Sequence, residues 1–275
     1  HNVVFGMTGT TQLGAYSVSP NGEIGPVSHL GGLVAGTSRP GVLAGTLEGG
    51  LLIVGASPGF SAYAMSGSAI SLSTQVEDTT ESLVEKVSVL AEVEAGDQRI
   101  IIAGSEAEQG ITSYVKVGDS VSLADVSGPA QGLGLMIPTD IATTTIAGSS
   151  YVIVATTHHH TSALSVFHVA ADGMLTATDH VLDTLDTRFG AAQAIEVVEH
   201  GGMRFVIAGG GDDGLTLFAL MADGKLQVLD TVVDRVKRHG NEVRHLPKAV
   251  RSLEKNLRAS FDGSEETESV SDMLE

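Results

Sequence analysis

The sequence predicts an all-β fold made of repeated four-stranded units, and three observations lead to that prediction. A short apolar strand recurs about every 50 residues. An alternating strand and a turn follow each copy in the same phase. The 275 residues include 34 Gly and only 4% aromatic residues, a composition typical of many tight turns around an aliphatic core.

The recurring apolar strand is the clearest element of the unit. Its copies are VVFGM (3–7), LLIVGA (51–56), IIIAGS (100–105), YVIVAT (151–156) and FVIAGG (205–210). Apolar runs of this length, bounded by Gly and polar residues, predict buried strands.

A second strand, with period-2 alternation, follows each apolar strand. Its copies are LGAYSVS (13–19), FSAYAMS (60–66), ITSYVKV (111–117), ALSVFHVA (163–170) and LTLFALMA (215–222). Turn dipeptides such as Asn21-Gly22, Asp172-Gly173 and Asp223-Gly224 come next, and they tolerate the positive φ angles that hairpins require. A third strand then follows, as in residues 225–233.

A further strand precedes the apolar strand in every unit except the first. It is visible in residues 41–50, 86–96, 140–149 and 192–202. Four-stranded units at this period predict a β-propeller-like array of about five blades, which could belong to a larger ring. The expected blade cores lie near residues 3–40, 41–80, 86–128, 140–183 and 192–233.

Residues 234–275 differ in composition from the repeats and have two interpretations. An apolar stripe at helical spacing predicts a short C-terminal helical tail with a flexible end; it consists of Leu246, Val250, Leu253, Leu257 and Phe261. Alternatively, the segment is a degenerate sixth blade, because LRASFD (257–262) lies one repeat after FVIAGG.

The blade pattern resembles that of lactonase-like and YVTN-type β-propellers over about residues 1–233. The residues that carry this resemblance are Val206–Gly209, Asp213–Phe218, Asp223–Leu226, Val152–Ala155 and Ser165–Leu175. Within that group, the repeats are most similar to those of large secreted bacterial proteins that also contain hemolysin-type calcium-binding repeats. The resemblance implies a propeller, and propellers host many different functions.

The stretch IAGGGDDGLTLF (207–218) matches the GxGxxG pattern of dinucleotide-binding loops through its glycines. That motif requires a helix after the glycines, whereas LTLFALMA alternates like a strand. A calcium-binding glycine/aspartate repeat would need tandem copies, and only one partial copy is present. We therefore expect an inter-strand loop, with an isolated calcium ion on Asp212 and Asp213 as the alternative.

Three consecutive histidines, His158, His159 and His160, occupy the equivalent loop of the fourth unit. Imidazole groups bind zinc, nickel or copper, and carboxylates from neighbouring blades could complete such a site. Consecutive residues at a strand end point in alternating directions, so at most two of the three can converge. An exposed polar loop is the interpretation we favour over a metal site.

The connections between blades are expected on the same rim as these loops, and they carry Arg39 and Arg188. Two guanidinium groups could hold an anionic sugar acid, as a lactone hydrolase would require. Both arginines are equally explained as partners of neighbouring acids, such as Asp183 or Asp186. The sequence contains no G-x-S-x-G, no H-E-x-x-H and no Cys nucleophile, so no catalytic residue is assigned.

The charge and the absence of Cys narrow the class of protein. A net charge of −18 repels phosphate backbones and anionic lipids, so nucleic acids and membrane surfaces are not expected partners. No apolar run is long enough for a membrane span. With no Cys, disulfides and thiolate metal sites are excluded.

Taken together, these observations predict a non-catalytic binding or scaffold module of a secreted bacterial protein. Its expected partners are other domains of a longer chain or an extracellular ligand. A sugar-lactone hydrolase of the lactonase-like type and a calcium- or metal-dependent binding domain are the alternatives. No cofactor is expected, apart from calcium in the last of these.

Overall fold

The computed structural model describes residues 2–7, 13–30, 37–44, 48–66, 69–131, 135–158 and 161–233. In these residues the strands form five antiparallel sheets, called blades 1 to 5 in chain order. Blade 1 contains β1 (Asn2–Met7), β2 (Leu13–Val18) and β3 (Ile24–Leu30). Blade 2 contains β4 (Thr37–Ala44), β5 (Glu48–Ala56), β6 (Phe60–Ser66) and β7 (Ala69–Val76).

The three remaining blades have the same four-stranded construction. Blade 3 contains β8 (Val87–Ala95), β9 (Gln98–Ser105), β10 (Gly110–Val117) and β11 (Ser120–Ser127). Blade 4 contains β12 (Ile137–Ile146), β13 (Ser149–His158), β14 (Thr161–Val169) and β15 (Leu175–Leu182). Blade 5 contains β16 (Ala194–His200), β17 (Met203–Gly209), β18 (Gly214–Leu220) and β19 (Leu226–Val233). A 3-10 turn (Pro129–Gln131) follows blade 3.

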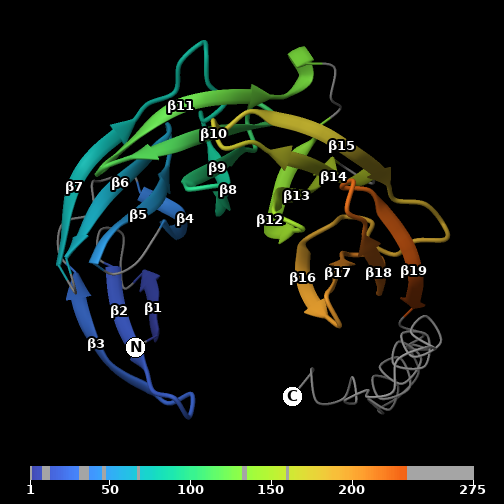
Figure 1. Cartoon of the computed structure of the whole chain (residues 1–275), viewed down its shortest axis with the longest axis horizontal. Helices are drawn as coiled ribbons and strands as arrows, with labels where there is room; N and C mark the ends of the chain where they lie inside the picture. The colour runs from blue at the N-terminus through green and yellow to red at the C-terminus, as the bar shows by residue number, and fades with distance from the viewer. Residues whose placement is uncertain are drawn as a thin grey trace.

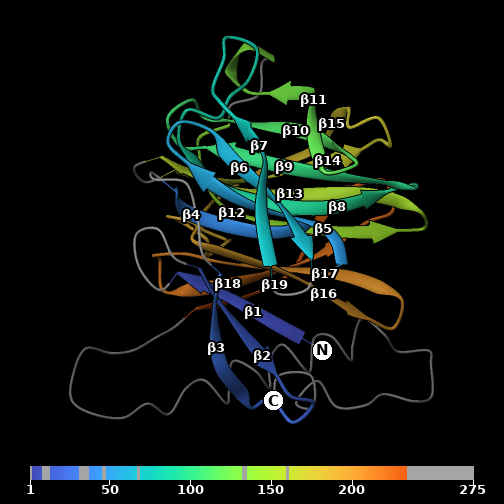
Figure 2. The same cartoon turned by 90° about the vertical axis from the view of Figure 1, so that its left-hand side faces the viewer.

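The blades follow one another along a curve, each as an antiparallel meander (Figure 1). The first strands of blades 2 to 5 lie on the inside of the curve, where neighbours contact one another, and the last strands lie outside. Figure 2 views the array from its side, with blade 1 at the lower edge and blade 3 at the upper edge. This arrangement confirms the predicted β-propeller-like fold.

Blade 1 has three strands in the described residues, as expected from a first unit without a leading strand. The predicted helical tail, or degenerate sixth blade, falls on residues 234–275, which lie outside the described residues. No helix in the described part of the chain has the length and apolar character that crossing a membrane would require.

The core lies between the blades rather than within one sheet. Alternate side chains of a strand face opposite neighbours. In β13, Val152 and Val154 pack with blade 3, whereas Ile153 and Ala155 pack with blade 5. All four are fully buried. Aliphatic side chains dominate these layers, in agreement with the low aromatic content of the sequence.

A repeated carboxylate links the outer strands of neighbouring blades. In blades 3, 4 and 5 a β-bulge interrupts the pairing of the last two strands, and Asp125, Asp179 and Asp230 follow it. Asp125 Oδ2 accepts a 2.8 Å hydrogen bond from the Leu175 N–H of blade 4. Asp179 Oδ2 accepts a 2.7 Å bond from the Leu226 N–H of blade 5. We call Asp125 and Asp179 the interblade aspartates.

Candidate functional site

The connection between blades 4 and 5 begins with a compact turn held by side-chain hydrogen bonds. Thr187 Oγ1 accepts a 2.7 Å bond from the Thr184 N–H and donates a 2.8 Å bond to Asp183 Oδ1. The Phe189 N–H donates to the same carboxylate oxygen at 3.2 Å. The Phe189 ring is fully buried and contacts Phe218 edge to face. These contacts anchor the turn on the rim and fix the direction of Asp183.

The loop between β17 and β18 lies against this connection. The Gly211 N–H donates a 2.7 Å bond to the carbonyl oxygen of Gly190. A Cβ on Gly210 would lie 2.2 Å from that oxygen, so the close approach requires glycine. Strand β18 follows directly, which confirms the expected inter-strand loop and leaves no helix for a dinucleotide-binding fold.

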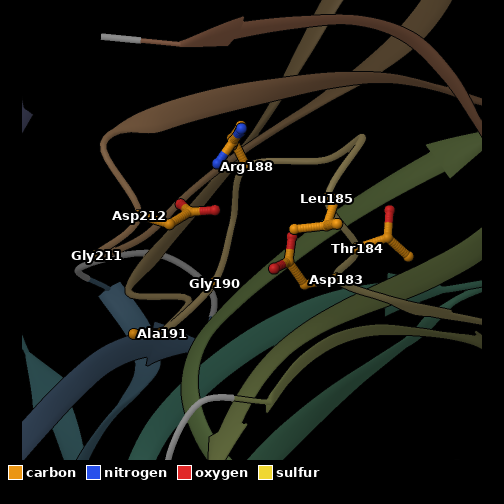
Figure 3. A pocket seen from close by; sticks show the side chains of 8 residues that line it. All are labelled: Asp183, Thr184, Leu185, Arg188, Gly190, Ala191, Gly211 and Asp212. Carbon is orange, nitrogen blue, oxygen red and sulfur yellow. The ribbon is translucent and has the colours of Figure 1, made fainter. Parts of the chain in front are cut away.

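A cavity of about 470 Å³ lies between the two segments (Figure 3). Its lining comprises Asp183, Thr184, Leu185, Arg188, Gly190, Ala191, Gly211 and Asp212. A Cβ on Gly190 would lie 3.1 Å from Asp183 Oδ2 and 3.3 Å from Asp212 Oδ2. The two carboxylates therefore approach Gly190 so closely that a side chain at this position would crowd them. The volume is in the range of small-molecule sites.

Asp212 is unusual in this lining because its Oδ1 atom is buried and has no hydrogen-bond partner among the described residues. A buried polar atom without a partner is costly, and functional sites are one of the places where such atoms occur. Figure 3 shows Asp183 and Asp212 turning their carboxylates toward the space between the two segments. Asp212 as a whole is only half-buried, so its carboxylate group still borders the cavity.

Arg188 borders the same space (Figure 3). Its backbone N–H donates a 2.8 Å bond to Thr216 Oγ1, which holds the residue in place. Its half-buried side chain forms no ion pair with the described residues. The sequence suggested neighbouring acids as its partners, but no such ion pair is present in the described part of the chain. The guanidinium group is therefore available to a ligand.

The connection between blades 2 and 3 repeats the same turn without the same lining. Ser82 Oγ accepts a 3.0 Å bond from the Thr79 N–H, and the Val84 N–H donates to Asp78 Oδ1 at 3.2 Å. The Leu83 N–H donates to Thr112 Oγ1 at 3.0 Å, as Arg188 does to Thr216. We call residues 78–85 the first rim turn and residues 183–190 the second rim turn.

The positions that differ between the two rim turns and the loops beside them include three residues of the cavity lining. Leu83 takes the place of Arg188, and Glu85 takes the place of Gly190. Glu108 corresponds to Asp212, since each precedes a residue with positive φ, Gln109 or Asp213.

The carboxylate of Glu108 is already engaged, because its Oε2 accepts a 2.9 Å bond from the Glu85 N–H. Burial raises the pKa of Glu108, and the nearby charges of Asp78 and Glu85 add to this effect. Beside it, burial raises the pKa of Tyr114 to about 12. The Tyr114 hydroxyl is buried and forms no hydrogen bond of normal geometry with the described residues.

The remaining predicted site residues lie elsewhere or outside the described part of the structure. Asp213 is exposed, has a φ of 57° and does not line the cavity. His158 ends β13 and is exposed, whereas His159 and His160 lie outside the described residues. Arg39 lies in β4, and its side chain is not among those that the structure describes.

Metal binding therefore stays a prediction. Among the described residues, no three His, Cys, Asp or Glu side chains are grouped as a metal site would require. Calcium on Asp212 and Asp213, and a metal on the histidine run, are neither supported nor contradicted by contacts in the described part of the chain.

Arg188 and Asp212 were predicted as candidate site residues from the sequence. Asp183, Thr184 and Gly190, which line the same cavity, were not. The sequence does contain a shared pattern. Residues 78–82 and 183–187 both consist of Asp-Thr, one variable residue, an acidic residue and then Ser or Thr. Hydroxyl and carboxylate side chains at these spacings are typical of hydrogen-bonded turns.

Comparison with known proteins gives matches among solved structures alone. No family model matches the chain, and no curated protein is similar to it. A structure from Bacteroides fragilis described as a "putative 6-phosphogluconolactonase" has a TM-score of 0.54 at 12% identity, covering 84% of this chain and 70% of its own. One from Bacteroides uniformis with the same description has a TM-score of 0.57 at 10% identity, covering 83% and 70%.

A periplasmic gluconolactonase from Pseudomonas aeruginosa has a TM-score of 0.59 at 15% identity, covering 89% of this chain and 70% of its own. Identities this low carry the fold and not the activity. None of the three descriptions mentions calcium-binding repeats, so the resemblance to hemolysin-type proteins gains no support. The chain therefore has the fold of the lactonase-like β-propellers.

Proposed function

We propose that the protein hydrolyses a sugar lactone in the cavity between the second rim turn and the β17–β18 loop. One observation carries this proposal: the Asp212 carboxylate and the Arg188 guanidinium border the same cavity, and neither forms an ion pair with the described residues. Similarity to structures described as lactonases favours this function over the scaffold role predicted from sequence. The assignment rests on the site, since a fold alone does not specify a reaction.

The two side chains suit the two demands of ester hydrolysis. A water molecule attacks the lactone carbonyl carbon while Asp212 accepts the proton that the water loses. The carbonyl oxygen becomes negatively charged, and Arg188 stabilises that charge by donating hydrogen bonds. When the ring C–O bond breaks, the leaving ring oxygen takes the proton back from Asp212. The product is an open-chain hydroxy acid, whose carboxylate Arg188 can hold until release.

The rest of the lining suits a sugar. Asp183 keeps Oδ1 bonded within its turn, so Oδ2 is left to accept a hydrogen bond from a substrate hydroxyl. The Thr184 hydroxyl also borders the cavity and can donate or accept. Leu185 and Ala191 supply apolar surface against the sugar ring.

The test is hydrolysis of glucono-δ-lactone by the purified chain, followed through acid release with a pH indicator and corrected for the spontaneous rate. Asp212→Asn should lower kcat/KM by about 100-fold, the typical contribution of a general base. Glu108→Gln is the matched control, because Glu108 occupies the equivalent position in blade 3; it should retain the native rate. Absence of any rate above the spontaneous one would reject the proposal and leave the binding or scaffold module as the better hypothesis.

The same assay addresses the predicted calcium ion. Activity in EDTA, compared with activity after calcium is restored, separates a metal-independent site from one that needs an ion on Asp212 and Asp213. The mechanism above uses side chains alone and predicts equal rates in both conditions.

A further inference from the structure

Provided that the cavity is the lactone site proposed above, we infer that its substrate is an unphosphorylated sugar lactone and that Asp183 and Asp212 select against a phosphorylated one. Two of the three similar structures are described by a phosphorylated substrate and one by an unphosphorylated substrate. The charges in the lining decide between these classes for this protein.

The charged groups that line the cavity are two carboxylates and one guanidinium. They belong to Asp183, Asp212 and Arg188, and no Lys or His is among the described residues of the lining. One guanidinium cannot offset both carboxylates, so the site keeps a net negative charge before a substrate enters. A phosphate group at neutral pH carries close to two negative charges.

The two carboxylates are also close together, which concentrates their effect. Both Oδ2 atoms lie within about 3.3 Å of the Cβ position that Gly190 leaves empty. The two carboxylates therefore lie on either side of Gly190 and both face a substrate that enters the cavity. At about 6 Å in water, one carboxylate repels a dianion by enough to weaken its binding about tenfold. A phosphate near this space is therefore penalised, whereas a neutral group is not.

Sugar hydroxyls are favoured by the same carboxylates, because hydroxyl groups donate the hydrogen bonds that carboxylates accept. Asp212 Oδ1 is buried without a partner, and Asp183 Oδ2 is not used by the turn. Hydrogen bonds to ionised acceptors are about twice as strong as those between neutral groups. An unphosphorylated lactone can offer a hydroxyl to Asp183 Oδ2, leave Asp212 to the attacking water and keep Arg188 for its carbonyl oxygen.

The overall charge of the protein acts in the same direction. A net charge of −18 lowers the local concentration of anions and slows their association at low salt. Salt screens this effect, since the Debye length falls from about 30 Å at 0.01 M to about 3 Å at 1 M. Discrimination against a phosphorylated substrate should therefore shrink as the ionic strength rises.

The experiment compares kcat/KM for glucono-δ-lactone and for its 6-phosphate with the purified chain at low ionic strength. We expect the neutral lactone to be preferred by about tenfold, because Arg188 offsets one of the two carboxylates. Asp183→Asn keeps the hydrogen-bond acceptor of the turn but removes one charge, and should reduce the preference about tenfold. Asp78→Asn makes the same change in the first rim turn and should leave the preference unaltered.

The outcomes separate this inference from the proposed function. Equal or faster hydrolysis of the 6-phosphate, with no change in Asp183→Asn, would overturn the inference while the lactonase proposal stands. Hydrolysis of neither lactone would overturn both. If Asp183→Asn fails to fold, which a melting curve reveals, the salt dependence of the native preference decides: a preference unaffected by salt contradicts selection by charge.

Discussion

The two rim turns have the same hydrogen-bonded backbone but different side chains around it, and their comparison separates the residues that hold the turn from those that line the cavity. In both turns a carboxylate and a hydroxyl accept hydrogen bonds from backbone N–H groups of the turn. A threonine from the next blade accepts a further hydrogen bond, from the N–H of Leu83 in the first turn and of Arg188 in the second. Two of the differences, Leu83 against Arg188 and Glu85 against Gly190, fall on residues that contribute no side chain to that scaffold. Side chains outside the hydrogen-bonded scaffold can therefore differ without altering the turn.

Glu108 and Asp212, the acidic residues beside the two rim turns, also differ in whether they bond to the backbone. Glu108 is long enough to accept the Glu85 N–H, and its carboxylate serves the backbone. Asp212 is one methylene shorter, and its Oδ1 is left buried without a partner in the described structure. One acid bonds to the backbone and the other borders the cavity, although both stand before a residue with positive φ.

The largest effect is expected from making the second turn like the first. Arg188→Leu removes the one cation among the described residues of the cavity lining and should lower kcat/KM on glucono-δ-lactone by about 100-fold or more, as loss of a donor to an oxyanion does. The melting temperature should stay nearly constant, because the Thr216 bond uses the backbone. Steady-state kinetics and a melting curve check both. Retained activity would remove Arg188 from the site.

The second effect tests whether the two scaffolds are equivalent. Thr112 and Thr216 are fully buried, and each accepts the backbone N–H of its rim turn. Replacing either with Val leaves a backbone donor without a partner, so unfolding free energy should fall by about 1–3 kcal/mol in each variant. Urea denaturation measures this loss. Clearly unequal losses would mean that the two turns are not equivalent in energy.

A smaller effect on stability is expected at Tyr114 and Phe218, which occupy equivalent positions in β10 and β18. The Tyr114 hydroxyl is buried without a well-formed hydrogen bond, so Tyr114→Phe should raise the unfolding free energy by up to about 1 kcal/mol. The reverse change, Phe218→Tyr, should destabilise blade 5. Denaturation at pH 7 gives both values. A loss in Tyr114→Phe would indicate a hydrogen bond to a nearby group such as Ser82.

The smallest effect concerns the raised pKa of Glu108. Because the pKa of Glu108 is higher in the folded state, the protein loses stability as the pH rises from the unfolded-state pKa, near 4.5, through the folded-state pKa. Below the unfolded-state pKa this group causes no loss of stability. Glu108→Gln keeps an acceptor for the Glu85 N–H. It should be more stable than the native chain at pH 7, by less than about 1 kcal/mol, and equal to it below about pH 4. Melting curves across this pH range test the sign.

Much of the fold is predictable from the sequence because strand period and turn dipeptides are local signals. The repeat of apolar strands anticipates the antiparallel blades, and LTLFALMA correctly indicates a strand after the glycines of residues 209–214. Arg188 and Asp212 were both recognisable as rim residues for the same reason.

The cavity itself was not predictable, because it depends on how two segments meet in space. Gly190 appears in the sequence as an ordinary loop glycine, and its role emerges only from the two carboxylates on either side of its Cβ position. The missing partner of Asp212 is likewise a property of packing. Sequence spacing carries no information on which oxygen atoms remain unsatisfied.

The interblade aspartates have a consequence for how the molecule opens. Asp125 and Asp179 each hold an amide that belongs to the following blade, so the first residue of an outer strand is protected by its neighbour rather than by its own sheet. When blade 3 opens, the Leu175 amide becomes exposed to solvent exchange even though blade 4 is intact. The amides of Leu175 and Leu226 thus report the breathing of the blade before them, and fluctuations spread along the array one neighbour at a time.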